Sequence, residues 1–381
     1  MEFALTEEQS AIFDMARGVA IEKIAPFAQE WEEKEHLPRS IIKELGELGM
    51  AAIYIGGDYG SDLSRLDATL IFEGLSYGCA STAAFLSIHN MCTWMVYEYA
   101  KDAVKEKWLE KMASGEAICS YCLTEPGSGS DAAALRTTAA KKDDCFILNG
   151  SKAFISGGGY SDLYIAMVRT GESGPKGVSA LLIEDGCEGL SFGANEKKMG
   201  WRNQPTTEVQ FESCNVPLDS LLGEEGEGFS YAMMGLDGGR LNIAACSLGA
   251  AQSALDKSLA YMGERKAFGK TLDQFQALQF KLAEMEIELQ AARVFLRQAA
   301  WKYDNQTPDA TKHCAMAKKF VTDVCFKIAN DALQMHGGYG YLSDYGIEKI
   351  VRDLRVHQIL EGTNEIMQLI VSRALLTEEN L

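Results

Sequence analysis

The sequence predicts an α+β protein with an all-α N-terminal domain, an antiparallel β middle domain and a C-terminal four-helix bundle. At the usual domain size of about 150 residues, a chain of 381 residues corresponds to two or three domains. Hydrophobic residues recur with helical spacing at both ends of the chain and with strand-like patterning between them. We therefore expect domains at residues 1–116, 117–225 and 226–381.

Composition excludes several classes of protein. Hydrophobic residues make up 47% of the chain and charged residues 24%, a mixture typical of globular proteins with a sizeable core. The formal net charge of −18 argues against nucleic-acid binding, because that function needs a basic surface. No apolar run approaches the ~20 residues of a membrane span, so we expect no membrane association. Many of the ten cysteines lie in apolar runs, which predicts reduced thiols in a reducing compartment.

Helix signals begin at the start of the chain. Thr6 and Gln9 form a capping box before an apolar helical pattern, and Ser40 is a good N-cap for a further helix. Two more helices are expected at about 64–75 and 81–99. We expect no secretory or transit segment, which fits a bacterial cytoplasmic protein or a mature mitochondrial matrix protein.

Strand signals dominate the middle of the chain. Short β-branched and aromatic runs predict strands at 162–170, 178–183 and 208–211. The Asn149-Gly150 pair predicts a hairpin, because these residues accept the positive φ angles of a type I′ turn. These features together predict an antiparallel β domain.

The last third of the chain returns to helical spacing. A heptad pattern of apolar residues predicts a helix of about 30 residues that packs in a bundle or at a subunit interface. Thr307-Pro308 predicts the start of the next long helix, with an N-cap followed by proline at the first helical position. The residues of the heptad pattern are Phe275, Leu278, Leu282, Met285, Leu289, Ala292 and Leu296.

Several nucleotide and metal motifs are missing. No G-x-G-x-x-G follows a predicted strand, which disfavours a Rossmann NAD site. Cys119 and Cys122 form a C-x-x-C without a second pair at zinc spacing, so we expect no metal site. The segment 263–271 has five residues between its glycines and follows a helix, whereas a phosphate loop has four and follows a strand. A P-loop enzyme is therefore disfavoured.

Four segments taken in order resemble the acyl-CoA dehydrogenase family over essentially the whole chain. They are Tyr121–Asp131 (YCLTEPGSGSD), Glu264–Gly269 (ERKAFG), Gln334–Gly340 (QMHGGYG) and Glu361–Glu365 (EGTNE). The resemblance implies the acyl-CoA dehydrogenase fold, FAD as cofactor and an acyl-CoA thioester as substrate. It also implies α,β-dehydrogenation, electron transfer to an electron-transfer flavoprotein, and a homotetramer built as a dimer of dimers.

Glu361 matches the catalytic base of this family. In the implied reaction it removes the α proton while the β hydrogen leaves as hydride to flavin N5. Apolar neighbours such as Ile359 and Leu360 would raise its pKa, whereas the N-terminus of the following helix would lower it. Some relatives, such as the isovaleryl-CoA type, carry the base next to the arginine matched by Arg240. This chain has Gly239 there, which argues against the isovaleryl and long-chain types.

The resemblance also implies the residues that bind cofactor and substrate. The flavin loop and the next strand contribute Tyr121, Leu123, Thr124, Gly129, Ser130, Phe154 and Ser156. Contacts across a subunit boundary are implied for Arg265, Phe268, Phe275, Gln276, Gln334, Gly337 and Gly338. The start of the last helix contributes Thr363 and Glu365. Substrate contacts are implied for Ser130, Asp237, Arg240 and Arg373. Many relatives have tryptophan where this chain has Phe154.

The residue before the base bears on the substrate. Leu360 stands where straight-chain members often carry tyrosine, which favours a short 2-methyl-branched acyl group and the conversion of isobutyryl-CoA to methacrylyl-CoA in valine breakdown. Butyryl-CoA and 2-methylbutyryl-CoA stay open, because one methyl group is worth only about 1–3 kcal/mol of discrimination. An acyl-CoA oxidase that uses oxygen directly and a CoA-binding scaffold without activity are the remaining alternatives.

Overall fold

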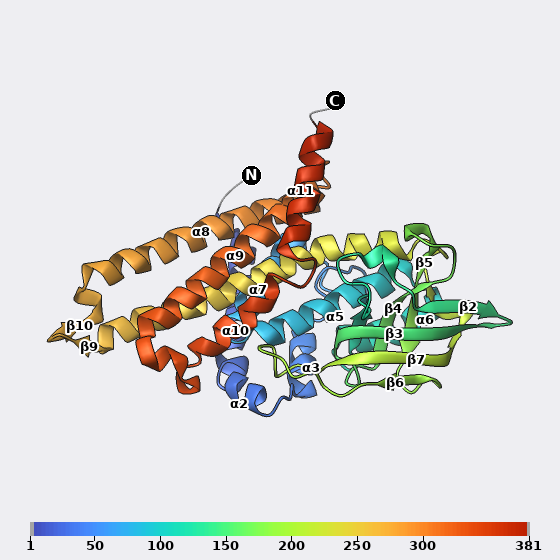
Figure 1. Cartoon of the computed structure of the whole chain (residues 1–381), viewed down its shortest axis with the longest axis horizontal. Helices are drawn as coiled ribbons and strands as arrows, with labels where there is room; N and C mark the ends of the chain where they lie inside the picture. The colour runs from blue at the N-terminus through green and yellow to red at the C-terminus, as the bar shows by residue number, and fades with distance from the viewer. Residues whose placement is uncertain (1–3, 379–381) are drawn as a thin grey trace.

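A computed structural model describes residues 4–378 as an elongated molecule, with the β domain at one end and long helices reaching the other (Figure 1). The first helices are α1 (Glu7–Val19), α2 (Ala28–Glu33), α3 (Arg39–Glu47), α4 (Arg65–Ser76), α5 (Ala80–Tyr99) and α6 (Asp102–Ala113). The capping box at Thr6 is present as predicted. Ser40 is not an N-cap, because it lies inside α3 and Pro38 takes the cap position.

The middle of the chain forms one sheet with a short additional strand. Its members are β1 (Cys119–Cys122), β2 (Thr138–Lys142), β3 (Cys145–Ser156), β4 (Leu163–Arg169), β5 (Val178–Glu184), β6 (Leu190–Phe192), β7 (Thr206–Pro217) and β8 (Leu221–Leu222). The strand order is β6-β7-β3-β2-β4-β5-β8, and β1 pairs with β4. The sheet is antiparallel except that β4 pairs in parallel with β1 and, at one residue, with β2. The antiparallel prediction therefore misses these two pairings.

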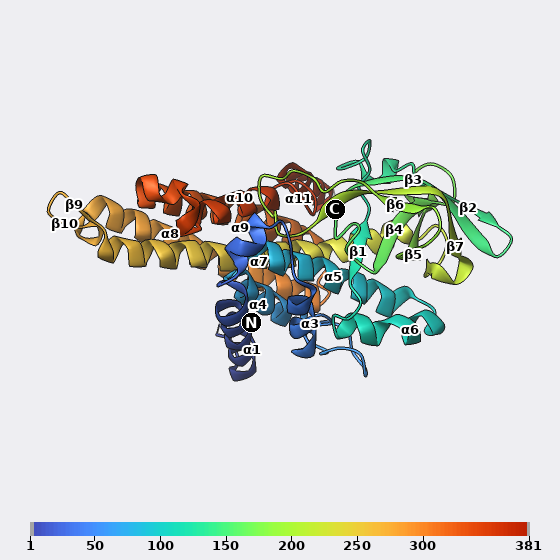
Figure 2. The same ribbon diagram turned by 90° about the horizontal axis from the view of Figure 1, so that it is seen from below.

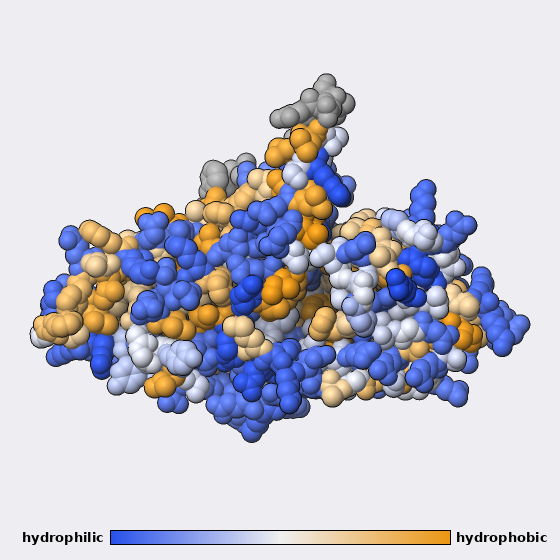
Figure 3. Space-filling view, in the orientation of Figure 1, coloured by the Kyte–Doolittle hydropathy of each residue, from blue (hydrophilic) through white to orange (hydrophobic). Residues whose placement is uncertain are grey.

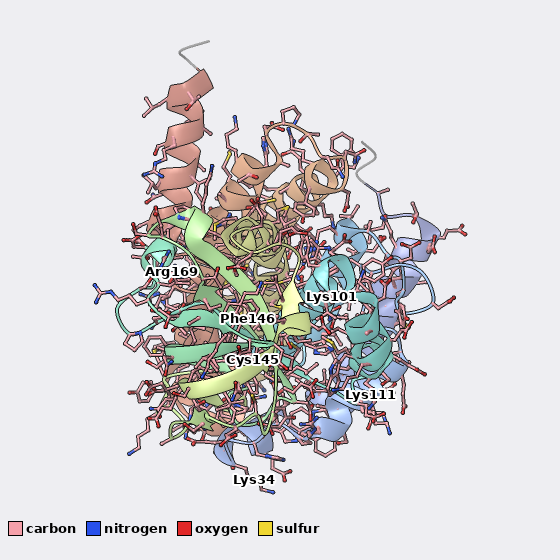
Figure 4. The ribbon with its side chains drawn as sticks, turned by 90° about the vertical axis from the view of Figure 1, so that its right-hand side faces the viewer. Lys34, Lys101, Lys111, Cys145, Phe146 and Arg169 are labelled. Carbon is pink, nitrogen blue, oxygen red and sulfur yellow. The ribbon has the colours of Figure 1, made fainter. Side chains whose placement is uncertain are left out.

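The predicted hairpin at Asn149-Gly150 is wrong. Strand β3 runs through both residues without turning, and its pairing with β7 shifts register there. The Asn149 side chain accepts a hydrogen bond from the Ser213 backbone N–H at 2.8 Å, so it stabilises a bulge. The actual turn lies between Lys142 and Cys145, where β2 and β3 pair. Figure 4 views this end of the molecule, with Cys145 and Phe146 at the start of β3 and Arg169 at the end of β4.

Long helices fill the rest of the molecule (Figure 2). They are α7 (Gly228–Glu264), α8 (Gln276–Asp304), α9 (Ala310–His336), α10 (Ile347–His357) and α11 (Asn364–Glu378), and the small hairpin β9 (Lys266–Ala267) and β10 (Lys270–Thr271) joins α7 to α8. Helix α9 begins later than predicted, because Asp309 takes the N-cap position and accepts a hydrogen bond from the Thr307 hydroxyl at 2.8 Å.

The heptad pattern of α8 is buried along only part of its length. From Met285 onward its members lie in the core, whereas Phe275, Leu278 and Leu282 remain half-buried in the single chain. No helix among residues 4–378 has the length and apolar character to cross a membrane.

The site lies where helices and sheet meet. One hydrophobic core joins α1–α5 to α7–α10, and a second joins α5 and α6 to β1, β4 and β5. Helix α7 is buried on most sides because Gly, Ala and Ser let neighbouring helices approach it closely. For example, a Cβ atom at Gly249 would lie 1.9 Å from the Glu73 backbone oxygen of α4. Helices α5 and α7 contribute to both cores and so lie between the helical core and the sheet.

Candidate active site

Glu361 lies on the tight turn between α10 and α11. Glu361 and Gly362 both adopt left-handed backbone conformations, with φ angles of 56° and 85°. The turn directs the Glu361 carboxyl group at α7, where a Cβ atom added to Gly239 would lie 2.6 Å from Oε2. A Cβ atom at position 239 would therefore displace the Glu361 carboxyl group, so glycine at this position makes room for it.

Burial controls the protonation of Glu361. Its Oε2 atom is buried and has no hydrogen-bond partner among the described residues. Burial raises the pKa of Glu361 to about 7, against the opposing effect of the cations Arg240 and Lys318. A carboxyl group with this pKa is partly ionised at neutral pH, which suits proton abstraction.

The residues that bury Glu361 are not the neighbours Ile359 and Leu360 that the sequence suggested. Leu360 packs against the helical core, but Ile359 is 50% exposed, so the immediate neighbours do not bury the carboxyl group. The Glu361 carboxyl group instead faces Tyr121 on β1, Cys92 on α5 and Cys246 on α7, and burial together with the charge of ionised Glu361 raises the pKa values of these three groups. Distant elements therefore create the water-poor environment.

Arg240 and Asp237, two expected substrate contacts, lie beside this carboxyl group. The Arg240 side chain is 5% exposed, donates a hydrogen bond to Asp237, and its Nε lies 3.4 Å from the Glu361 backbone oxygen. Asp237 also accepts a hydrogen bond from the Thr311 hydroxyl at 2.7 Å. These contacts fix one wall of the site on α7 and α9.

Tyr121, at the end of β1, faces the same space. Its hydroxyl group is buried without a partner among the described residues, as is Oε2 of Glu361. Burial raises the pKa of Tyr121, and the charges of Cys92 and Glu361 raise it further. Two unpartnered buried polar atoms at the floor of one site are what a polar ligand or cofactor would satisfy.

The loop after β1 is held by a buried ion pair that sequence reasoning missed. Lys152 Nζ lies 2.8 Å from Glu125 Oε1 and donates a further hydrogen bond to the Leu123 backbone oxygen at 3.2 Å. Glu125 also accepts hydrogen bonds from the backbone N–H groups of Arg136 and Thr137. The sequence carried no signal for this pair, because Lys152 follows exposed residues of β3 and looks like an ordinary surface charge. This pair fixes the loop that carries Thr124, Gly129 and Ser130.

Phe154 turns outward from the sheet. It has a positive φ of 59°, and its side chain is 67% exposed at a bulge where the β3–β7 pairing lapses. The Ala153 N–H donates to the Thr124 backbone oxygen at 2.8 Å, and the Ser120 hydroxyl donates to the Ser156 backbone oxygen at 2.6 Å. The exposed ring of Phe154 follows these contacts with Thr124 and Ser156, and the Tyr121 hydroxyl group has no partner among the described residues. This arrangement fits the isoalloxazine ring of a flavin.

A second group of expected cofactor residues lies at the far tip of the helices. Arg265, Gln334, Gly337 and Gly338 line a cavity of about 540 Å³. Met335 and His336 of the expected segment 334–338 line it too. Sequence reasoning missed several other residues of this cavity, and only their proximity to the predicted ones could have indicated them; they are Tyr261, Leu272, Leu278, Tyr339 and Leu342.

Aromatic rings stand beside this cavity. Phe268 is 96% exposed on the β9–β10 turn, and its ring lies 6.2 Å from that of Phe275, which precedes Gln276 at the start of α8. Arg265 lies over the ring of Tyr339, 5.1 Å from its centre. An exposed arginine among aromatic rings and glycines fits a phosphate-bearing dinucleotide.

The two groups do not meet within one chain. Helix α7 runs unbroken from Gly228 to Glu264, so Gly239 and Arg265 are separated by about 39 Å at 1.5 Å per residue. Figures 1 and 2 show the β9–β10 tip and the α10–α11 turn at separate places along the molecule.

The remaining predicted residues lie on α11 or immediately before it. The Thr363 hydroxyl accepts a hydrogen bond from the Ile366 N–H at 3.3 Å, and Glu365 is in the first turn of the helix. Glu365 and Arg373 are both exposed. No cluster of three or more His, Cys, Asp or Glu side chains that could hold a metal ion lies among residues 4–378.

Comparison with known proteins decides the family. Residues 6–116, 120–214 and 226–376 match the models of the N-terminal, middle and C-terminal domains of acyl-CoA dehydrogenase. The chain belongs to the acyl-CoA dehydrogenase family. It is therefore an FAD-dependent oxidoreductase, as the resemblance implied, and its three-domain fold is that of the family.

Two curated relatives and one solved structure are highly similar. Mitochondrial isobutyryl-CoA dehydrogenase of Dictyostelium discoideum is 52% identical, over 99% of this chain and 91% of its own length. The Bos taurus protein of the same name is 50% identical, over 98% and 90%. The structure of butyryl-CoA dehydrogenase from Megasphaera elsdenii superposes with a TM-score of 0.94 at 38% identity, covering 99% of this chain and all of that one.

Proposed function

We propose that this acyl-CoA dehydrogenase converts isobutyryl-CoA to methacrylyl-CoA, with Glu361 as the base that removes the α proton. The observation that carries the proposal is the Glu361 carboxyl group, buried beside Arg240 with an unpartnered Oε2 and a pKa raised to about 7. A base is most effective when its pKa lies near the operating pH. A side chain at position 239 of α7 would displace the Glu361 carboxyl group, and this chain has glycine there.

Different residues of the chain accept the α proton, set the charge of the base and exclude water. The Glu361 carboxylate accepts the proton, and Arg240 and Lys318 keep part of the Glu361 population ionised at neutral pH. Tyr121, Cys92 and the α7 backbone exclude water, which strengthens the electrostatic interactions in the site. FAD, when bound, supplies the acceptor that takes the β hydrogen as hydride. Thr124, Phe154 and Ser156 would hold its ring, and Ser130 and Asp237 would contact the CoA thioester.

The branched acyl group is supported by the residue before the base and by the relatives. Leu360 packs against the helical core next to Glu361. The relatives named isobutyryl-CoA dehydrogenase are 52% and 50% identical, whereas a relative named short-chain-specific acyl-CoA dehydrogenase, from Clostridium acetobutylicum, is 39% identical. Short straight-chain butyryl-CoA and branched 2-methylbutyryl-CoA are the competing substrates.

The substrate proposal is tested by measuring kcat/KM with isobutyryl-CoA, butyryl-CoA, 2-methylbutyryl-CoA and isovaleryl-CoA. We expect isobutyryl-CoA to be preferred by about 10-fold or more, the size of discrimination that one methyl group allows. A higher kcat/KM for butyryl-CoA would leave the dehydrogenase in place and refute the branched substrate.

We infer that FAD is bound between two copies of the chain. The distance of about 39 Å between Gly239 and Arg265 supports this arrangement, because it keeps the two groups of expected cofactor residues far apart within a single chain. Helix α8 also exposes apolar residues at every seventh position, at Phe280 (64%), Ile287 (62%), Val294 (46%) and Trp301 (39%). Figure 3 shows apolar surface along the edge of the molecule that α8 forms. A homotetramer built as a dimer of dimers would cover this stripe and complete the cofactor sites.

We propose an electron-transfer flavoprotein as the electron acceptor. The outward-facing Phe154 supports a route for electrons at the surface, next to where the flavin would lie. An acyl-CoA oxidase would differ in reacting directly with oxygen. Slow reoxidation of the reduced enzyme in air, and fast reoxidation by electron-transfer flavoprotein, are the expected results. All ten cysteines carry free thiols, which supports a bacterial cytoplasm or a mitochondrial matrix as its compartment.

A further inference from the structure

Lys318 is a buried cation beneath the turn that carries Glu361. Its side chain on α9 is 0% exposed, and Nζ donates to the Gly362 backbone oxygen at 2.7 Å and to Asn364 Oδ1 at 2.9 Å. Both acceptors are uncharged, and within residues 4–378 no carboxylate lies within ion-pair distance of Lys318. Burying a lysine is costly unless a charge compensates it. The position of Lys318 therefore calls for a compensating group nearby.

The surrounding hydrogen bonds clamp the turn from α9. Asn364 donates to Asp323 Oδ1 at 2.7 Å, and Gln358, just before the turn, donates to the same atom at 2.6 Å. Lys318 binds the carbonyl group of Gly362, which lies between Gln358 and Asn364 in the chain. The left-handed conformations of Glu361 and Gly362 are persistent only where such contacts over-determine them.

Titratable groups on the elements packed around Glu361 affect its pKa or face it. Arg240 on α7 and Lys318 on α9 are the cations, and they lower the pKa of Glu361 against burial. Cys92, Tyr121 and Cys246 are the other titratable groups that face it, and burial keeps all three in the neutral form at neutral pH.

Burial and neighbouring charges also determine whether Lys318 itself is protonated. Burial lowers the pKa of Lys318 to about 8, and the charges of Glu361, Asp323 and Glu365 oppose that decrease while Arg240 adds to it. Lys318 is therefore a cation at pH 7 and becomes neutral on the alkaline side. His357, which Lys318 also affects, is neutral because burial lowers its pKa to about 3.

We propose that Lys318 is a positioning residue for Glu361, which fixes the Gly362 carbonyl group and supplies the positive charge that keeps the carboxylate available as a base. The inference rests on the proposed role of Glu361. Arg240 already pairs with Asp237, so Lys318 is the cation of the site that has no carboxylate partner of its own. The compensating charge of Lys318 is the ionised form of Glu361.

The test compares the pH dependence of flavin reduction by isobutyryl-CoA in wild type and in Lys318→Met. We expect the midpoint of the acid limb to move up by about one pH unit, because removing a nearby cation disfavours the carboxylate. The rates should converge above about pH 9, where Lys318 of the wild type is itself neutral. Lys318→Arg should restore the midpoint, and Lys327→Met, an exposed lysine of the same helix, should leave it unchanged.

A rate that falls by the same factor at every pH, with an unchanged midpoint, would show that Lys318 is only structural. Lys318→Gln, which is neutral but keeps a hydrogen-bond donor, should shift the midpoint too, and it decides the question if Lys318→Met does not fold. Glu361→Gln separates the two proposals. An active Glu361→Gln variant refutes the base itself, whereas an inactive one combined with unshifted Lys318 variants refutes only the role of Lys318.

Discussion

Glu361 and Gly239 share a space that holds one side chain. The Glu361 carboxyl group occupies the volume that a Cβ atom at position 239 would fill, so the two positions are alternatives for an acid. This contact gives a physical reason for the sequence expectation that a chain with glycine at position 239 carries its base on the turn before α11. The proposed chemistry therefore depends on a residue that has no side chain.

We predict that Gly239→Ala lowers the rate of flavin reduction by about 10²-fold, the effect expected when a reacting group is displaced by about 1 Å. The added Cβ atom would lie 2.6 Å from Glu361 Oε2 and would displace the carboxyl group. The measurement is stopped-flow flavin reduction, with FAD content as a check on folding. Gly263→Ala, on the same helix with nothing within 4 Å of the added atom, is the control and should keep the wild-type rate.

The sequence indicated candidate residues where a motif contains them, but it did not indicate residues that matter through packing. Glu361 and Arg240 lie in segments for which the family resemblance implies a role, and the structure brings these two residues together. Lys152 and Lys318 look like ordinary surface charges in the sequence, yet both are 0% exposed and organise the site. Their burial results from contacts between segments far apart in the chain, which no local pattern contains.

Strand β3 shows how an element can override its own turn signal. Asn149-Gly150 favours a hairpin locally, but β7 offers a partner along the full length of β3, and the pair is absorbed as a bulge. Element types were otherwise predictable because the hydrophobic period is strong in long helices and buried strands. The start of α9 was displaced because Asp309 competes with Thr307 as a cap.

We predict that Gly150→Ala destabilises the protein by about 2 kcal/mol or more, because the residue combines a φ of 141° with close contact. The added Cβ atom would lie 2.7 Å from Thr137 Cα. Urea unfolding monitored by circular dichroism gives the free energy. Gly18→Ala in α1 is the control: nothing lies within 4 Å of its Cβ position, and it should be neutral or stabilising by up to about 1 kcal/mol.

If FAD is bound between two copies of the chain, as we propose, cofactor binding and assembly of the whole molecule depend on each other. We predict that Ile287→Asp produces smaller species that release FAD, since a charge buried in an interface without a partner is costly. Light scattering for mass and the ratio of flavin to protein absorbance measure both effects. Ile21→Asp replaces an isoleucine of similar exposure outside the α8 stripe and should retain mass and FAD. A Ile287→Asp variant with unchanged mass would contradict the proposed interface.

Acid stability of the whole molecule depends in part on His89 and His357, two of the buried histidines. Burial lowers the pKa of His89 to about 4 and that of His357 to about 3, below the value of about 6.5 in the unfolded chain. Their contribution to stability is therefore complete above pH 6.5 and is lost as pH falls toward the folded values. Glu361 acts in the opposite sense, because its raised pKa favours the folded state as pH falls from 7 toward 4.5.

We therefore predict a net loss of about 2 kcal/mol of unfolding free energy between pH 7 and pH 5, since the two histidines together outweigh Glu361. Urea unfolding at the two pH values measures the loss. His89→Gln should be less stable at pH 7 but should lose less on acidification. An equal pH dependence in this variant and in wild type would contradict the assignment to His89.

The most direct test of the central claim is an anaerobic spectral titration with isobutyryl-CoA, performed on wild type and on Glu361→Gln. We predict that wild type loses its flavin absorbance, and that the variant keeps its FAD and reacts at least about 10²-fold more slowly, the size of a general-base effect. Bleaching of Glu361→Gln at the wild-type rate would show that another group removes the α proton and would refute Glu361 as the base.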